Sequence, residues 1–239
     1  MFDALLFDLD GTMLNMEIDK FLPLYFKEMV QAAEKHGLPG QELLAKVIAS
    51  TDVMVNTKNP GVTNEEAFWA DFQKNWQYDF QKTYDFFQLF YDQHFPLLKS
   101  HFDSYPIAKD IMNEAFSKGL KVVIATNSIF PLQAITERLN WAGIEHFPYD
   151  LITSYEIMHY CKPHPDYFLE IANMLQVKPQ RCLMIGNDTG EDLVAGKVGM
   201  KTFLVENLII DRGTDFVPDW RGSINDLHEF LKNDFPQNK

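Results

Sequence analysis

The stretch ALLFDLDGT, residues 4–12, places four apolar residues directly before two aspartates, a glycine and a threonine. A short apolar run of this kind predicts a strand buried on both faces, as at the centre of a parallel sheet. Asp8 and Asp10 then follow the carboxyl end of the strand, the edge at which open parallel sheets bind ligands. Residues two apart on an extended chain point the same way, so both carboxylates can face one spot, where a metal ion or a shared proton usually relieves their repulsion. Gly11 permits a sharp turn as the chain leaves the strand.

Composition and charge narrow the class of protein. The chain has 239 residues, 46% of them hydrophobic, and a formal net charge of −13 at pH 7. These values are typical of a globular protein with one large domain or a core with an inserted smaller one. The negative charge argues against nucleic acid or an anionic membrane as the main partner.

Two further features bear on location. Cys161 and Cys182 are the two cysteines; they form no disulfide framework and fit a reducing compartment. Residues 1–3 are not a basic region followed by an apolar signal core, and no uncharged apolar run approaches the roughly 18 residues of a membrane span. We therefore expect a cytoplasmic protein.

After the opening motif the hydrophobic pattern changes from strand to helix. Apolar residues recur at helical spacing in four runs, which predicts helices capped at Asp19 and at residues 63–66 and two more over residues 41–50 and 83–95. Residues 15–100 are thus predicted to form an all-helical block. The block is dense in aromatic residues, which we assign mainly to packing between its helices, with some as candidates to line a substrate pocket.

From residue 104 onward, strand and helix patterns alternate. The predicted strands and helices, in chain order, cover residues 107–118, 121–127, 130–141, 151–153, 165–175, 182–185, 191–198 and 201–205, followed by a closing helix that begins after Ser223. Such alternation predicts an α/β fold with a parallel sheet, Rossmann-like, and helices on both faces. Residues 206–221 show no pattern that predicts an element.

Each strand of this second block is followed by a group with chemical use. Thr126 and Asn127 follow one strand and offer a hydroxyl and backbone N–H groups to a phosphoryl oxygen. Lys162 lies in the run CKPHP between a strand and a helix, and Asp188 and Asp192 follow a third strand. Because the carboxyl ends of parallel strands share one edge, these groups are expected beside the two aspartates of the first strand.

These motifs, in this order, resemble those of the haloacid dehalogenase-like hydrolase superfamily. The four segments that carry the resemblance are residues 8–12, residues 126–127, Lys162-Pro163 with Pro165 and Phe168, and the pair Asp188 and Asp192. The resemblance covers the whole chain, because the helical block corresponds to the cap that this superfamily inserts after its first motif. It implies a catalytic core of residues 1–14 and 101–239 and a helical cap of residues 15–100.

The resemblance also implies a role for each motif residue. Asp8 would be the nucleophile that forms an aspartyl phosphate. Asp10 would be the general acid that protonates the leaving oxygen and then the base that activates water. Lys162 would offset negative charge, Thr126 would donate a hydrogen bond to a phosphoryl oxygen, and Asn127 would donate through its backbone N–H.

A Mg²⁺ cofactor follows from the same resemblance. Its ligands would be Asp8, Asp188 and the backbone carbonyl of Asp10, since hard oxygen donors and retained waters suit that ion. Asp192 would support the metal's waters or the motif lysine rather than bind the ion.

Several neighbouring residues have smaller expected roles. Gly11 and Thr12 would support the first motif. Asn187 stands where the family often has glycine, and we attach no functional meaning to it. Glu191 is expected to be a solvated acid.

The resulting hypothesis is a Mg²⁺-dependent phosphatase for a small phosphomonoester, with the cap closing over the site during phosphoryl transfer. Its partner would be a small phosphorylated metabolite, not nucleic acid or a membrane, and the protein would be a monomer or homodimer. Nucleoside monophosphates, sugar phosphates and phosphoglycolate all remain open as substrates.

Three alternatives stand beside this hypothesis. A dehalogenase of the same superfamily lacks the second aspartate, so Asp10 counts against it. A sugar-phosphate mutase would share every catalytic residue named above. A non-catalytic phosphate-binding regulatory protein, such as a receiver-like domain, would be shorter and capless and would not need Asp10.

Overall fold

The computed structural model describes residues 2–236. Its main sheet has six parallel strands in the order β5-β4-β1-β6-β7-β8. These strands are β1 (Ala4–Phe7), β4 (Lys121–Ile124), β5 (Leu151–Ile152), β6 (Cys182–Gly186), β7 (Lys201–Val205) and β8 (Trp220–Gly222). The predicted α/β class with a Rossmann-like parallel sheet is confirmed.

Strand β1 lies inside the sheet, between β4 and β6. All four of its residues are buried. Leu5 and Phe7 belong to the hydrophobic cluster on one face, and Ala4 and Leu6 belong to the cluster on the other. Burial on both faces explains why this strand is an uninterrupted apolar run rather than an alternating one.

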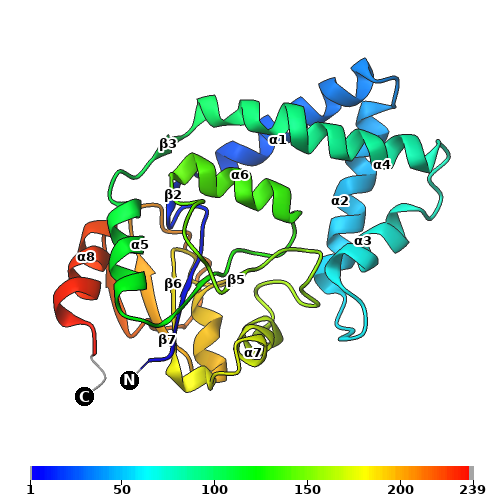
Figure 1. The fold of residues 1–239 in the computed structure, drawn as a ribbon. Coiled ribbons are helices and arrows are strands. Elements are labelled where there is room, and N and C mark those ends of the chain that lie inside the picture. The colour runs from blue at the N-terminus through cyan, green and yellow to red at the C-terminus, as the bar shows by residue number, and fades with distance from the viewer. Residues whose placement is uncertain (1, 237–239) are drawn as a thin grey trace.

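Helices cover both faces of the sheet (Figure 1). One face packs against α5 (Ala108–Ser117), α6 (Leu132–Ala142) and α8 (Ile224–Glu229), and the other against α7 (Pro165–Met174) and the 3-10 helix η4 (Leu193–Val198). The helix predicted over residues 191–198 is present as a 3-10 helix that begins two residues later, at Leu193. The Asp188 carboxylate accepts the backbone N–H groups of Gly190 and Glu191, which delays the helical turn, and Gly199 at φ +88° ends it.

A helical segment lies between two short strands, β2 (Leu14–Asn15) and β3 (Asp103–Ser104), which pair antiparallel. The segment contains α1 (Ile18–Lys35), α2 (Gly40–Asn56), α3 (Asn64–Phe72), α4 (Phe80–Leu89), the π-helix η1 (Phe90–His94) and the 3-10 helix η2 (Phe95–His101). The β2–β3 pair brings the two ends of the segment together, and α2 and α3 lie far from α8 (Figure 1). The division into a core of residues 1–14 and 101–239 and a cap of residues 15–100 stays a prediction; residues 1 and 237–239 lie outside the described part.

The ends of these helices differ in places from the predicted ones. Helix α1 begins at Ile18 with Glu17 as its N-cap, so the predicted cap at Asp19 is wrong. The capping box of α3 is confirmed: the Thr63 hydroxyl accepts the Glu66 N–H at 3.2 Å, and the Glu66 carboxylate accepts the Thr63 N–H at 2.9 Å. In addition, α2 continues six residues past the predicted end at Ser50.

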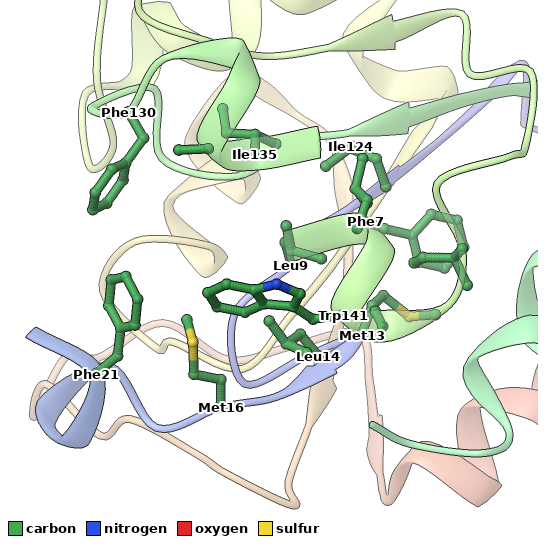
Figure 2. Close-up of a cluster of buried hydrophobic side chains, with 14 of the residues drawn as sticks. Phe7, Leu9, Met13, Leu14, Met16, Phe21, Ile124, Phe130, Ile135 and Trp141 are labelled. Atoms are coloured by element: carbon green, nitrogen blue, oxygen red, sulfur yellow. The ribbon is translucent and has the colours of Figure 1, made fainter. Parts of the chain in front are cut away.

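An aromatic cluster joins the helical segment to the sheet. Trp141 of α6 lies among Leu9, Leu14 and Met16 (Figure 2), and its ring stacks on Phe95 at 5.3 Å between centroids. Most aromatic residues of the helical segment belong to the same buried cluster as one face of the sheet. The predicted packing role of these aromatics is therefore confirmed.

No helix within residues 2–236 is both long enough and apolar enough to cross a lipid bilayer.

Candidate active site

A cavity of about 110 Å³ lies at the carboxyl edge of the sheet. Six residues predicted from the sequence line it: Asp8, Asp10, Thr126, Asn127, Asp188 and Asp192. They come from the loops that follow β1, β4 and β6, because parallel strands deliver their carboxyl ends to one edge. The cavity is also lined by two arginines, Arg138 and Arg212, that were not among the predicted site residues.

Lys162 is not among the residues that line this cavity, but it is buried between two of the carboxylates that do. Its Nζ atom donates to Asp8 Oδ1 at 2.9 Å and to Asp192 Oδ1 at 2.6 Å. Burial alone lowers the pKa of Lys162, but the charges of Asp192 and Asp8 outweigh it and hold that pKa well above its usual range. Lys162 is therefore positively charged at neutral pH, and its ammonium group fixes one oxygen of Asp8.

Thr12 and Asn187 fix the rest of the first motif. The Thr12 hydroxyl lies 3.1 Å from Asp8 Oδ2 and 3.0 Å from Asn187 Oδ1. Gly11 has φ +79°, and a Cβ atom there would lie 2.3 Å from Asn187 Nδ2. Asn187, to which the sequence alone attached no meaning, thus packs directly on the turn that positions Asp8.

Asp10 pairs with Arg138, which reaches it from α6. One terminal guanidinium nitrogen of Arg138 donates to Asp10 Oδ2, and the guanidinium lies over the Phe130 ring, 4.5 Å from its centroid. Burial raises the pKa of Asp10 to about 6, against the opposing effect of Arg138 and with a further increase from Asp8. The other oxygen, Asp10 Oδ1, is buried without a hydrogen-bond partner.

A signal for Arg138 is present in the sequence. Ala134, Ile135, Leu139 and Ala142 form the apolar face of α6, and Arg138 falls on that same face. A charged residue within an apolar stripe is rarely buried without a partner, so this position was a recognisable candidate.

Asp188 is the third carboxylate of the cavity, and all its contacts are to cationic or N–H donors. Its Oδ1 accepts the backbone N–H groups of Gly190 and Glu191 at 2.8 and 2.9 Å. Its Oδ2 accepts two hydrogen bonds from Arg212, at 2.8 Å from Nε and 2.7 Å from the terminal nitrogen. Arg212 belongs to the stretch without a predicted element, which pairs with the loop after β6: the Thr189 N–H donates to the Ile210 carbonyl, and the Ile210 N–H donates to the Asn187 carbonyl.

Asn127 and Glu191 connect two of the loops. The Asn127 side chain accepts the Lys162 N–H at 3.2 Å and donates to the Lys162 carbonyl at 3.3 Å and to Glu191 Oε2 at 3.0 Å. Glu191 is half-buried in the cavity wall, and burial raises its pKa. The prediction that the Glu191 side chain is solvated is therefore wrong, because its hydrogen bond with Asn127 holds it in the cavity wall.

Thr126 is held from behind by two hydroxyl groups. Thr153 Oγ1 and the Tyr167 hydroxyl donate to the Thr126 carbonyl at 2.8 and 2.7 Å. Thr126 lines the cavity, and these two hydrogen bonds fix its backbone there.

The donor set of the cavity suits Mg²⁺. Asp8 and Asp188 line the same cavity, and proteins commonly hold Mg²⁺ through one or two carboxylates completed by water and substrate oxygens. Across residues 2–236, no group of three or more His, Cys, Asp or Glu side chains is arranged to hold a metal. A metal at Asp188 would have to share that carboxylate with Arg212 or displace it.

Comparisons with known proteins identify the family to which this chain is similar. A family model described as haloacid dehalogenase-like hydrolase matches residues 2–199. The glyceraldehyde 3-phosphate phosphatase of Methanothermobacter thermautotrophicus is 31% identical over 114 residues, which are 47% of this chain and 49% of that protein. A pyrophosphatase PpaX of Bacillus cereus is 28% identical over 43% of this chain and 46% of that protein. The chloroplastic protein SUPPRESSOR OF QUENCHING 1 of Arabidopsis thaliana is 31% identical over 52% of this chain but only 12% of its own length. The matched region thus spans about half or less of these relatives.

Solved structures share the fold over nearly the whole chain. A HAD phosphatase from Thermococcus onnurineus superposes with a TM-score of 0.58 at 19% identity, covering 96% of this chain and 97% of that one. An L-2-haloacid dehalogenase from Xanthobacter autotrophicus superposes with a TM-score of 0.56 at 15% identity, covering 98% and 99%. At these identities the likeness shows the fold, which phosphatases and dehalogenases have in common.

Proposed function

Because this chain belongs to the haloacid dehalogenase-like hydrolase family, and is therefore a hydrolase, we propose that it is a phosphatase that acts on a small phosphomonoester. The observation that carries the proposal is the placement of two carboxylates, Asp8 and Asp10, on one small cavity with different partners. Asp8 is held by a buried lysine, and Asp10 is held by a buried arginine. Two carboxylates in different environments can take different roles in one reaction.

In the proposed reaction, a carboxylate oxygen of Asp8 attacks phosphorus, and the bond between phosphorus and the leaving oxygen breaks. Asp10 gives its proton to the leaving oxygen, and the alcohol departs. Asp10 then takes a proton from water, which attacks the aspartyl phosphate and releases inorganic phosphate and Asp8. The contacts of Asp8 to Lys162 and Thr12 support this role because they limit its rotation.

Positive charge and N–H donors surround the proposed phosphoryl position. Lys162 supplies a buried cation, and Thr126 and the backbone of Asn127 supply hydrogen-bond donors at the cavity wall. Asp8, Asp188 and the Asp10 backbone carbonyl are the proposed ligands of Mg²⁺, which when bound supplies positive charge to the phosphoryl oxygens.

Asp10 distinguishes this proposal from dehalogenation, which needs no acid to protonate a leaving oxygen. The proposed partner is a small phosphorylated metabolite, and the proposed state is a monomer or homodimer. Cys161 and Cys182 are both free, which supports the reducing cytoplasm as the proposed location.

The test is release of inorganic phosphate from p-nitrophenyl phosphate and a panel of metabolite phosphates, with Mg²⁺ or with EDTA. We expect release that requires Mg²⁺ and is lost in Asp8→Asn. The exposed Asp215→Asn makes the same chemical change away from the cavity and should keep full activity. Folded protein that releases no phosphate from any ester would contradict the proposal, and transfer of phosphate to a second sugar position would indicate a mutase instead.

A further inference from the structure

A second and larger cavity, of about 490 Å³, lies between the helical segment and the loops that follow β4 and β5. Its volume is in the range of sites that bind small organic molecules. Helices α1, α3 and α4 and the π-helix η1 contribute an aromatic wall, which contains Tyr25, Phe68, Trp69, Tyr84, Phe87 and Tyr91. The indole Nε1 of Trp69 is buried without a hydrogen-bond partner in good geometry. The catalytic chemistry described above uses none of these side chains.

This aromatic cavity and the catalytic cavity share a wall. Ile129 and Phe130 line both, and they follow Thr126 and Asn127 on the same loop. The Phe130 ring contacts Arg138 on the catalytic side and Tyr25, at 5.5 Å between centroids, on the other. The part of a substrate next to a phosphoryl group at Thr126 would therefore lie close to Ile129 and Phe130, which also border the aromatic cavity.

The charge of the aromatic cavity restricts its occupant. None of its lining residues, all of which belong to the described part of the chain, is Lys, Arg or His. Two are acids, Glu65 and Glu156, which lie close enough that Glu156 adds to the effect of burial in raising the pKa of Glu65. The Glu156 carboxylate already has a partner, because it accepts a hydrogen bond from the Leu132 N–H at 2.9 Å. A carboxylate or second phosphate placed here would meet repulsion and find no cation.

We propose that the aromatic cavity binds the alcohol part of the substrate, a flat apolar ring system that is uncharged or positively charged. This inference deepens the proposed function and rests on it for the position of the phosphate. Aromatic walls favour stacked or edge-on rings, and a cationic substituent gains from both the ring faces and the two acids. Phosphoglycolate and sugar bisphosphates do not fit this description.

The first test compares three benzyl phosphates that differ only at the ring position opposite the phosphate: unsubstituted, aminomethyl and carboxylate. The methylene group insulates the leaving oxygen from the substituent, so differences in KM report the cavity. We expect the aminomethyl and unsubstituted esters to have KM values at least about tenfold below that of the carboxylate ester, equivalent to about 1.4 kcal/mol. A carboxylate ester that binds as well as the others would overturn the inference.

Two variants test whether the differences in KM arise in the aromatic cavity. Ile48 on α2 lines it and is 49% exposed, whereas Val53 on the same helix is 41% exposed and does not line it. Ile48→Trp should raise KM for the unsubstituted benzyl ester at least fivefold and leave KM for methyl phosphate unchanged. Val53→Trp should change neither. Equal effects of the two variants on benzyl phosphate would count against the cavity.

A charge variant examines the acids separately. Glu65→Gln should reduce the preference for the aminomethyl over the unsubstituted ester, whereas Glu34→Gln, at an exposed position on α1, should not. An unchanged preference in Glu65→Gln would show that the acids do not attract the positively charged substituent, which would contradict the inference for cationic substrates.

Binding of the alcohols separates this inference from the proposed function. Calorimetry of the wild-type protein with 4-(aminomethyl)benzyl alcohol and 4-carboxybenzyl alcohol requires no turnover. Binding of the amine alone, weakened by Ile48→Trp, would support the cavity assignment even if no phosphate were ever released. Phosphate release without such discrimination would support the phosphatase and overturn the cavity assignment.

Discussion

Arg138 on α6 donates a hydrogen bond to the Asp10 carboxylate, and the two side chains are only 1% and 14% exposed. The pair therefore joins the apolar face of a helix to the loop that carries the candidate nucleophile. Removing one member of a buried ion pair leaves the other charge uncompensated.

We therefore expect Arg138→Met to lower the free energy of unfolding by roughly 3–5 kcal/mol, measured by urea denaturation. The double variant Arg138→Met with Asp10→Asn should recover part of this loss, because it removes the stranded carboxylate as well. If Arg138→Met were as stable as the wild type, the ion pair between Arg138 and Asp10 would not contribute to the stability of the fold.

Gly11 and Gly143 offer a matched pair of glycines in the left-handed region, at φ +79° and +72°. A Cβ atom at Gly11 would lie 2.3 Å from Asn187 Nδ2, whereas at Gly143 it would have nothing within 4 Å. Gly143→Ala should cost about 1 kcal/mol for the backbone conformation alone. Gly11→Ala should cost at least about 1 kcal/mol more because of the collision.

Thermal or urea unfolding of both variants measures the difference. Adding Asn187→Ala to the Gly11→Ala variant should recover the excess, since it removes the colliding amide. Equal losses at the two glycines would mean that Asn187 simply moves aside.

Arg212 and Mg²⁺ are expected to compete for Asp188, because Arg212 already makes two hydrogen bonds to one of its oxygens. The Arg212 side chain is 49% exposed, so its ion pair is partly screened and worth at most about 1 kcal/mol. Arg212→Ala should therefore bind Mg²⁺ roughly two- to fivefold more tightly, measured by calorimetry without substrate.

The control is Arg221→Ala, which removes the same charge from an exposed pair with Glu206. Its Mg²⁺ affinity should equal that of the wild type. If Arg212→Ala bound Mg²⁺ no better than this control, Asp188 would not be a site of competition.

The thiols of Cys161 and Cys182 are expected to react slowly. Burial raises the pKa of both to about 12, above the roughly 8.5 of a free thiol. A raised pKa lowers the fraction of the reactive thiolate at neutral pH, and that fraction grows as the pH rises.

Alkylation by iodoacetamide at about pH 8 should thus be at least about 100-fold slower in the folded protein than in urea. Ser100→Cys places a thiol at an exposed position and should label quickly in the folded protein. Rapid labelling of the wild type would mean that these thiols are accessible in the native state.

Structural elements that depend on residues close together in the sequence could be predicted from the sequence. The apolar run of β1 and the capping box at Thr63 and Glu66 depend on residues a few positions apart, and both have the predicted form. The shared position of Asp8, Thr126 and Asp188 could also be predicted, because parallel strands place their carboxyl ends at one edge. Their catalytic roles stay predictions.

The partners of those residues were decided by the tertiary structure. Arg138 is 128 positions from Asp10, and only the packing of α6 against β2, the strand that follows Asp10, brings them together. Arg212 comes from a stretch with no periodicity, and only its backbone pairing with the loop after β6 carries it to Asp188. The aromatic cavity likewise needs the helical segment and the loops after both β4 and β5 at once. Sequence patterns report the backbone requirements of nearby residues, whereas the identity of a distant partner depends on which surfaces the folded chain buries together.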